Sequence, residues 1–219
     1  MKIKVLKDIL GANDQIAAKN RELLDSNKVF SVNIMASPGA GKTSVVLQTI
    51  RALKDKVRIG VIEGDIASSI DAETVAKEGI PVVQINTGGE CHLEANQLES
   101  ALNNLPLADI DLLLIENVGN LVCPAEFNLG EHRKVLIASV PEGDDKPFKY
   151  PLMFNTVDAL ILNKIDLLPY VKFDVNTFTK TVKNINAKVE IFKVSCTTGE
   201  GIQAWVKWLN AQIGRKSKK

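Results

Sequence analysis

The chain has 219 residues, of which 45% are hydrophobic and 24% are charged, and its formal net charge is +1. This length and composition are typical of one globular α/β domain with a sizeable core. A net charge so close to zero gives no overall field that would favour nucleic acid or a membrane surface, so we expect neither as a partner.

The composition also bears on location. No apolar run reaches the roughly 18 residues that a membrane-spanning helix requires. The first residues lack the apolar region of a signal peptide. The three cysteines are an odd number, which argues against a disulfide framework. We therefore expect a cytoplasmic protein whose thiols stay reduced.

Residues 1–28 precede the first predicted strand and form a segment of their own. Apolar residues recur there at helical spacing among polar ones, at Ile9, Ile16, Leu23 and Leu24. This spacing predicts one or two amphipathic helices that pack on or flank a main domain of residues 29–219. The favoured interpretation is a helix packed on its own domain, and the alternative is an arm that binds a partner.

A glycine-rich turn near the start of the main domain joins a predicted strand, 29–35, to a predicted helix that begins at Val45. It matches the phosphate-binding loop G-x-x-x-x-G-K-[ST], except that Ala36 replaces the first glycine. Backbone N–H groups in such a loop bind phosphate, Lys42 reaches the β- and γ-phosphates, and the Thr43 hydroxyl ligates Mg²⁺. The predicted binding residues are Pro38, Gly39, Ala40, Gly41, Lys42, Thr43 and Ser44. The alternative, an ordinary Gly/Pro loop, does not explain why strand, loop, Lys-Thr and helix follow in this order.

Short apolar runs and helical patterns alternate along the rest of the chain. Strands are predicted at 58–62, 82–85, 111–115, 135–140, 159–162 and 189–194, helices near 71–77, 92–102, 175–184 and 202–213, and a polar loop at 141–151. This alternation predicts an α/β fold, a mainly parallel sheet with helices on both faces. Ligands of such sheets bind beyond the carboxyl ends of the strands, where the polar clusters of this chain fall, so we expect one active site there.

Two clusters after late strands indicate guanine as the base. Asn163-Lys164-Ile165-Asp166 matches the N-K-x-D motif of P-loop GTPases. The Asp166 carboxylate can accept both N–H groups on the guanine edge, Asn163 can tie the base or the phosphate loop, and Lys164 can cover the base. Ser195 and Cys196 begin a stretch similar to the fifth GTPase element, with Cys196 more simply a packing residue than a metal ligand. Four such residues also recur by chance, so the prediction depends on the phosphate loop in the same chain.

Carboxylates at two other strand ends are suited to Mg²⁺ and to water placement near the γ-phosphate. Asp65 and Glu116 each end a strand, and Asp71 follows shortly after Asp65. We expect Thr43 and one or two of these acids on the metal, directly or through water. Each acid could instead cap a helix or face solvent, and Asp71 is equally well explained as an N-cap. Gly119 resembles a switch glycine that senses the γ-phosphate. The predicted catalytic residues are Lys42, Thr43, Asp65 and Glu116.

Cys91-His92 and Cys123 follow two other predicted strands. Thiolate and imidazole together suit Zn²⁺, Ni²⁺ or copper rather than Mg²⁺. One chain supplies three such ligands if the loops converge, and water, another group or a second chain must supply the fourth. The alternative is a pair of buried, inert cysteines, because free cysteine packs well in cores.

Taken together, these clusters resemble the hydrogenase nickel-insertion GTPases of the HypB family, in the SIMIBI class of P-loop proteins. The resemblance covers nearly the whole chain, including Glu63-Gly64-Asp65 and the stretches 86–93, 116–124, 142–146 and 163–166. The run around Cys123 is its most specific part. The resemblance implies a SIMIBI G domain that binds and hydrolyses GTP with Mg²⁺.

The same resemblance implies a GTP-dependent homodimer in which Cys91, His92 and Cys123 bind Ni²⁺ or Zn²⁺ at the subunit interface. It implies nickel delivery to the [NiFe]-hydrogenase large subunit, together with a small zinc protein of the HypA type. Lys149 is the candidate for a lysine that reaches the partner's nucleotide. Residues 1–28 contain no cysteine or histidine, so the N-terminal nickel site of some members is not implied here.

Three other functions remain open at this point. An accessory GTPase for urease or a cobalamin enzyme would share the fold, although Cys91-His92 and the run 117–124 favour hydrogenase maturation. A metal-storage or scaffold protein would bind nucleotide without hydrolysing it, and another P-loop enzyme would use ATP. Because Glu116 and Cys123 lie on one short connection, we expect the γ-phosphate state and the metal site to be coupled, and coupling of this kind is reciprocal.

Overall fold

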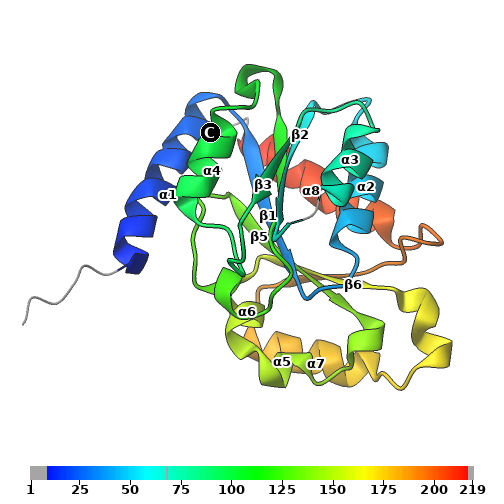
Figure 1. The fold of residues 1–219 in the computed structure, drawn as a ribbon. Coiled ribbons are helices and arrows are strands. Elements are labelled where there is room, and N and C mark those ends of the chain that lie inside the picture. The colour runs from blue at the N-terminus through cyan, green and yellow to red at the C-terminus, as the bar shows by residue number, and fades with distance from the viewer. Residues whose placement is uncertain (1–8, 68, 217–219) are drawn as a thin grey trace, which may run out of the picture.

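The computed structural model describes residues 9–67 and 69–216, whose arrangement is shown in Figure 1. Its strands are β1 (Phe30–Ala36), β2 (Ile59–Asp65), β3 (Val82–Asn86), β4 (Leu112–Glu116), β5 (Arg133–Ser139), β6 (Ala159–Asn163) and β7 (Glu190–Lys193). They form one seven-stranded sheet in the order β3-β2-β4-β1-β5-β6-β7, and every neighbouring pair is parallel. The predicted fold class, a parallel sheet of P-loop type, is confirmed.

Helices cover both faces of this sheet (Figure 1). On one face lie α2 (Lys42–Leu53), α3 (Ile70–Ala76) and α8 (Ile202–Lys216). On the other lie α1 (Ile9–Ser26), α4 (Ala95–Leu102), α6 (Pro151–Thr156) and α7 (Val175–Ile185), with α5 (Lys146–Lys149) beside α7. Alternate strand residues point to opposite faces, so strands buried on both sides are mainly apolar, and this made them recognisable in the sequence.

The predicted polar loop 141–151 is wrong in part, because α5 lies inside it and α6 begins at its end. Prolines begin both helices: Pro147 sits in the first turn of α5, and Pro151 is the first residue of α6. Proline breaks a helix interior but is favoured at the first helical position, where its missing N–H costs nothing. The prolines that suggested a loop therefore start helices here.

The first helix, α1, packs against α4 and β1. Its buried amides bind backbone: Asn13 accepts the Ala95 N–H at 2.8 Å, and Asn20 donates to Ala95 O at 2.8 Å and to Leu129 O at 3.1 Å. Arg21 Nε donates to Gly130 O at 2.7 Å. Residues 1–8 of the predicted N-terminal segment lie outside the described residues. No helix among the described residues is long and apolar enough to cross a membrane.

Candidate nucleotide and metal sites

The glycine-rich turn between β1 and α2 has the backbone that its glycines suggest. Gly39 and Gly41 have φ angles of 76° and 96°, in the left-handed region that side chains disfavour. A Cβ added at Gly41 would lie only 2.5 Å from Asn163 Nδ2. Ala36, which stands in place of the motif's first glycine, is the buried last residue of β1. The other predicted phosphate-binding residues follow in this turn and the start of α2: Pro38, Ala40, Lys42, Thr43 and Ser44.

The N-K-x-D segment after β6 contacts this turn directly. Asn163 Nδ2 donates to Ala40 O at 3.0 Å, and Lys164 Nζ donates to Gly39 O at 2.6 Å. Asp166 Oδ1 is shielded from solvent and has no hydrogen-bond partner within the chain. A buried acceptor without a donor is costly, so a ligand with N–H groups would stabilise it. The arrangement fits a guanine edge at Asp166.

The stretch after β7 lies beside Asp166. Ser195 is buried and its Oγ accepts the Thr198 N–H at 3.1 Å, while Cys196 O accepts from Gln48 Nε2 at 2.9 Å. Burial raises the pKa of the Cys196 thiol to about 11, and the nearby charge of Asp166 adds to the rise. The Cys196 side chain packs against the core cluster on the α2 and α8 face. The two predicted base-binding segments therefore converge.

Two strand-ending carboxylates were predicted near the start of α2, and one of them, Glu116, contacts it directly. Glu116 ends β4 and is 2% exposed, its Oε1 accepts from Thr43 Oγ1 at 3.0 Å, and the same oxygen lies 3.9 Å from Lys42 Nζ. Glu116 Oε2 is buried without a hydrogen-bond partner. Asp65 ends β2, and its Oδ1 accepts the Ala67 N–H at 3.1 Å. An unsatisfied carboxylate oxygen beside a threonine hydroxyl is the kind of hard donor set that Mg²⁺ binds, so these residues fit the ion.

Glu63 is a carboxylate beside Glu116 that was missed from the sequence. It pairs in register with Glu116 across β2 and β4 and is 3% exposed. Burial and the adjacent Glu116 raise its pKa well above the ordinary range, so Glu63 is protonated at neutral pH. Burial also raises the pKa of Glu116, against the opposing effects of Lys42 and Thr43. The available signal was a glutamate inside an apolar strand, two residues before the strand-ending Asp65.

Asp71 lies in the first turn of α3, close enough to Glu63 and Glu116 that its charge helps to raise both of their pKa values. The alternative role of Asp71 as an N-cap is wrong, because Ser69 occupies that position. Ser69 Oγ donates to Glu73 Oε1 at 2.7 Å. Asp71 therefore lies too far into α3 to be its N-cap, and its charge acts on the two buried glutamates.

Two loops touch the phosphate-binding turn from the side. Gly119 lies against Pro38, and a Cβ there would come within 3.1 Å of the Pro38 nitrogen. Ser37 Oγ donates to Glu142, a residue of the 142–146 stretch that was not predicted as a site residue. Lys149 lies farther along that connection, in α5, where its exposed ammonium pairs with Asp145 at 2.5 Å.

The two cysteine segments converge as the sequence suggested. Cys91 Sγ lies 2.9 Å from Cys123 Sγ and 3.7 Å from His92 Nδ1, and ligand atoms of the three residues lie within 4.8 Å of one another. Neither cysteine is buried, so the alternative of two inert core thiols is wrong. The hydrogen bond with Cys91 raises the pKa of Cys123. The His92 ring lies against Phe127 at 3.9 Å between centroids, and its Nε2 has no hydrogen-bond partner.

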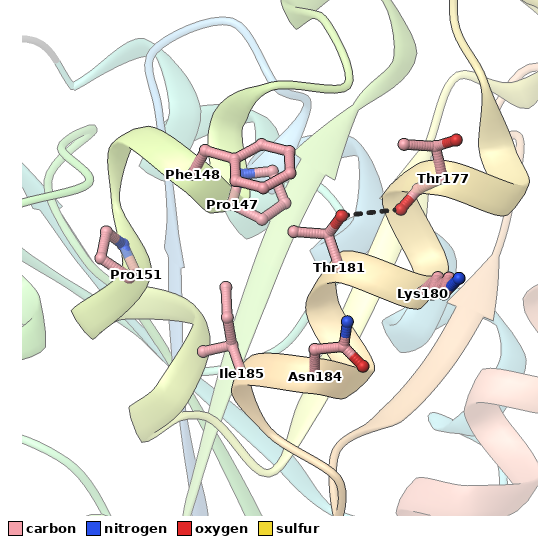
Figure 2. Close-up of a pocket in the computed structure, with 8 residues that line it drawn as sticks. All are labelled: Pro147, Phe148, Pro151, Thr177, Lys180, Thr181, Asn184 and Ile185. Carbon is pink, nitrogen blue, oxygen red and sulfur yellow. Dashed lines mark hydrogen bonds between the residues drawn. The ribbon is translucent and has the colours of Figure 1, made fainter.

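A separate groove of about 520 Å³ lies between the α5–α6 connection and α7. Figure 2 shows Phe148 and Pro147 on one side of it and Thr181 and Lys180 on the other. It shares no residue with the predicted nucleotide or metal sites.

Comparisons with known proteins identify the family and the fold. The sequence model of the family described as CobW/HypB/UreG, nucleotide-binding domain, matches residues 30–193 of this chain. Hydrogenase maturation factor HypB of Escherichia coli K12 is 45% identical over 210 residues, which cover 96% of this chain and 72% of that protein. The crystal structure of HypB from Archaeoglobus fulgidus superposes with a TM-score of 0.88 and 40% identity, over 93% of this chain and 100% of that one. HypB from Helicobacter pylori, in complex with nickel, gives a TM-score of 0.89 and 36% identity, over 93% and 96%. The chain therefore belongs to the CobW/HypB/UreG family of nucleotide-binding proteins, among the HypB hydrogenase maturation factors.

Proposed function

We propose that this chain is a GTP-hydrolysing metallochaperone that carries nickel, or zinc, at Cys91, His92 and Cys123 and assists nickel insertion into a [NiFe]-hydrogenase. The observation that carries the proposal is the convergence of two thiols and an imidazole at the end of the connection that begins at Glu116. The metal is the cargo of this protein. Soft sulfur and nitrogen ligands suit Ni²⁺ and Zn²⁺, and the fourth ligand comes from water or a second copy.

GTP would lie across the carboxyl ends of β1 and β6. Asp166 would accept the guanine N–H groups, with Asn163 and Lys164 holding the phosphate loop below and Ser195 and Cys196 flanking the base. The N-terminus of α2 and the glycine turn would bind the phosphates. Preference for GTP over ATP follows, because adenine offers no pair of adjacent N–H donors to Asp166.

Hydrolysis would depend on charge placement around the γ-phosphate. Lys42 would offset negative charge on the β- and γ-phosphates, and Thr43 and Glu116, with Asp65 or Asp71, would hold Mg²⁺. When bound, Mg²⁺ supplies further neutralisation of the charge that develops during phosphoryl transfer. Asp65 and Glu116 would also orient the attacking water. We expect slow intrinsic turnover, because no arginine finger or water-placing glutamine follows Gly119 in the run 120–127.

A homodimer linked to GTP and metal is the assembly we propose. Several large apolar side chains near Cys123 and Lys149 are exposed: Val122, Phe148 and Leu152. Exposed apolar groups gathered near a functional site are typical of an interaction surface. Lys149 would leave Asp145 and reach the partner's nucleotide across this surface. The further partners that we propose are a HypA-type zinc protein and the hydrogenase large-subunit precursor, in the cytoplasm where free thiols stay reduced.

The test measures metal content and oligomeric state of the protein with GTPγS and with GDP, for the wild type and for Cys91→Ser. We expect metal-bound dimer with GTPγS and a metal-poor protein for Cys91→Ser in either state. GTP hydrolysis should be measurable and should be lost in Lys42→Ala, which separates this function from nucleotide-bound storage. Nickel binding that survives in Cys91→Ser would overturn the proposed site.

A further inference from the structure

One buried amide joins the metal-bearing segment to the nucleotide-facing turn. Asn117 follows Glu116 directly and is 1% exposed. Its Oδ1 accepts two backbone N–H groups, from Leu93 at 3.0 Å and from Val118 at 2.9 Å. Leu93 comes immediately after His92, and Val118 comes immediately before Gly119. Asn117 Oδ1 therefore binds both Leu93, the neighbour of the predicted metal ligand His92, and Val118, the neighbour of the predicted γ-phosphate sensor Gly119.

The same side chain is anchored to the central strand. Asn117 Nδ2 donates to Asn33 Oδ1 at 3.2 Å, and the Asn117 backbone N–H donates to Ile34 O at 2.9 Å. Both partners lie in β1, the strand that leads into the phosphate loop. Because its amide is hydrogen-bonded at both ends in a packed interior, Asn117 has little freedom to turn without breaking one of these bonds.

Gly119 provides the nucleotide end of this link, because its backbone lies against Pro38 in the phosphate loop. A shift of the 118–119 turn when a γ-phosphate arrives would move the Val118 N–H relative to Asn117. Asn117 Oδ1 must then either lose its hydrogen bond to the Val118 N–H or move with it. If it moves, the hydrogen bond to the Leu93 N–H transmits the shift to Leu93. A second hydrogen bond, from Asn120 Nδ2 to Cys91 O at 3.3 Å, joins the residue after Gly119 to the cysteine of the other segment.

We propose that Asn117 is a positioning residue that couples nucleotide state to metal affinity by holding the Leu93 and Val118 N–H groups on one oxygen. This inference rests on the proposed function, since it assigns the residue that links the two sites. Asn117 touches neither nucleotide nor metal, and acts through the segments on either side. Its role is to make the position of His92 depend on the turn at Gly119.

Asn13 offers a matched control. This amide in α1 is 7% exposed, accepts the Ala95 N–H at 2.8 Å and donates to Asn128 O at 2.7 Å. Asn13 therefore binds the segment that carries Cys91 and His92, at Ala95, two residues after Leu93. Its other bond goes to the segment that follows Cys123 rather than to the turn at Gly119. Loss of Asn13 loosens the metal site without cutting the link to the nucleotide.

The test compares the Ni²⁺ dissociation constant with GTPγS and with GDP, by competition with a chromophoric chelator. Asn117→Ser is the informative variant, because a serine hydroxyl keeps a polar group at this position but is too short to reach the Leu93 N–H. We expect a ratio of at least about fivefold between the two states for the wild type, falling to near one in Asn117→Ser. Asn13→Ala should weaken nickel binding equally in both states and keep the wild-type ratio.

The outcomes separate the two proposals. A wild-type ratio of one would overturn the coupling in the proposed function and the role of Asn117 with it. A wild-type ratio that persists in Asn117→Ser, or that is lost equally in Asn13→Ala, would overturn the role of Asn117 alone. Amide hydrogen exchange of the wild type needs no variant: protection of the Leu93 N–H should differ between GTPγS and GDP, with the Ala95 N–H as the unchanged reference. Equal Leu93 protection in both states would also overturn the inference.

Discussion

The sulfur atoms of Cys91 and Cys123 lie 2.9 Å apart, although 32 positions separate them in the chain. Each sulfur ends a segment that leaves a different strand of the sheet, β3 or β4. At this distance the Cys91 thiol donates a hydrogen bond to Cys123 Sγ, and this contact raises the pKa of Cys123. Metal binding must therefore displace protons from the pair.

The first prediction follows from that displacement. A thiol with a raised pKa is still protonated at neutral pH, so Ni²⁺ affinity should increase as pH rises from 6 toward the pKa of the pair. The increase should be about tenfold per pH unit for each proton displaced. Chelator competition across this pH range measures it, and Cys91→Ala, which removes one of the two thiols, should release fewer protons. A pH-independent affinity would contradict binding of Ni²⁺ by thiols that are protonated in the free protein.

The second prediction concerns Glu63, whose pKa is raised above the ordinary value of 4.5. The unfolded chain ionises this group near that value while the folded protein keeps it protonated, so unfolding releases a proton at higher pH. The free energy of unfolding without nucleotide or Mg²⁺ should therefore fall as pH rises above about 4.5 and toward the folded pKa. Glu63→Gln should remove this loss and stabilise the protein at pH 8 by on the order of 1–3 kcal/mol, with little effect at pH 4.

Urea denaturation at the two pH values measures the effect of Glu63→Gln. Glu78→Gln is the control, because Glu78 is a surface carboxylate paired with Arg51 and Lys54, which lower its pKa. Its loss should give a small change of the opposite sign at pH 8. Destabilisation by Glu63→Gln at pH 8 would show that Glu63 is ionised in the folded protein.

The third prediction uses the two glycines of the phosphate loop. Alanine at either Gly39 or Gly41 is strained by the positive φ, but only the Cβ at Gly41 would meet Asn163, whereas the Cβ at Gly39 has open space around it. Gly41→Ala should therefore weaken GDP binding by at least about tenfold more than Gly39→Ala, equivalent to ~1.4 kcal/mol. Titration with a fluorescent GDP analogue measures both. Equal losses would indicate that backbone strain alone matters.

The fourth prediction tests base recognition by Asp166. The wild type should bind GTP more tightly than ITP, which lacks the guanine amino group, by about 10- to 150-fold, as expected for one hydrogen bond to a charged acceptor. Asp166→Asn should remove this preference, because an amide cannot accept both donors as a carboxylate does. ITP affinity should change less than GTP affinity. A retained preference for GTP would place base recognition elsewhere.

Much of this architecture is predictable from the sequence because most of its strands are buried on both faces. Mainly apolar runs marked the strands, and Gly39 and Gly41, which have positive φ, lie within the matched motif. The capping box of Glu94 and Gln97 starts α4 at Ala95, later than the predicted residue 92. That boundary depends on side-chain hydrogen bonds that periodicity does not report.

The parts that could not be predicted depend on register between distant strands. Glu63 faces Glu116 only because β2 and β4 pair at those positions, and Asn117 meets Asn33 only because β4 lies beside β1. A lone polar residue inside an apolar run carries no information about its partner. The motifs therefore identified the candidate ligand-binding residues, whereas the residues that hold them in place became visible only in three dimensions.

The hydrogen bonds from α1 to the two segments that carry Cys91, His92 and Cys123 have a mechanical consequence. Asn20 bonds to Ala95 O, just beyond Cys91 and His92, and to Leu129 O, just beyond Cys123 and Phe127. A force applied to α1, by a fused domain or a bound protein, would therefore act at the same time on the segment of Cys91 and on the segment of Cys123. Such a force would change the spacing of the two sulfur atoms, and with it the fit of a soft cation.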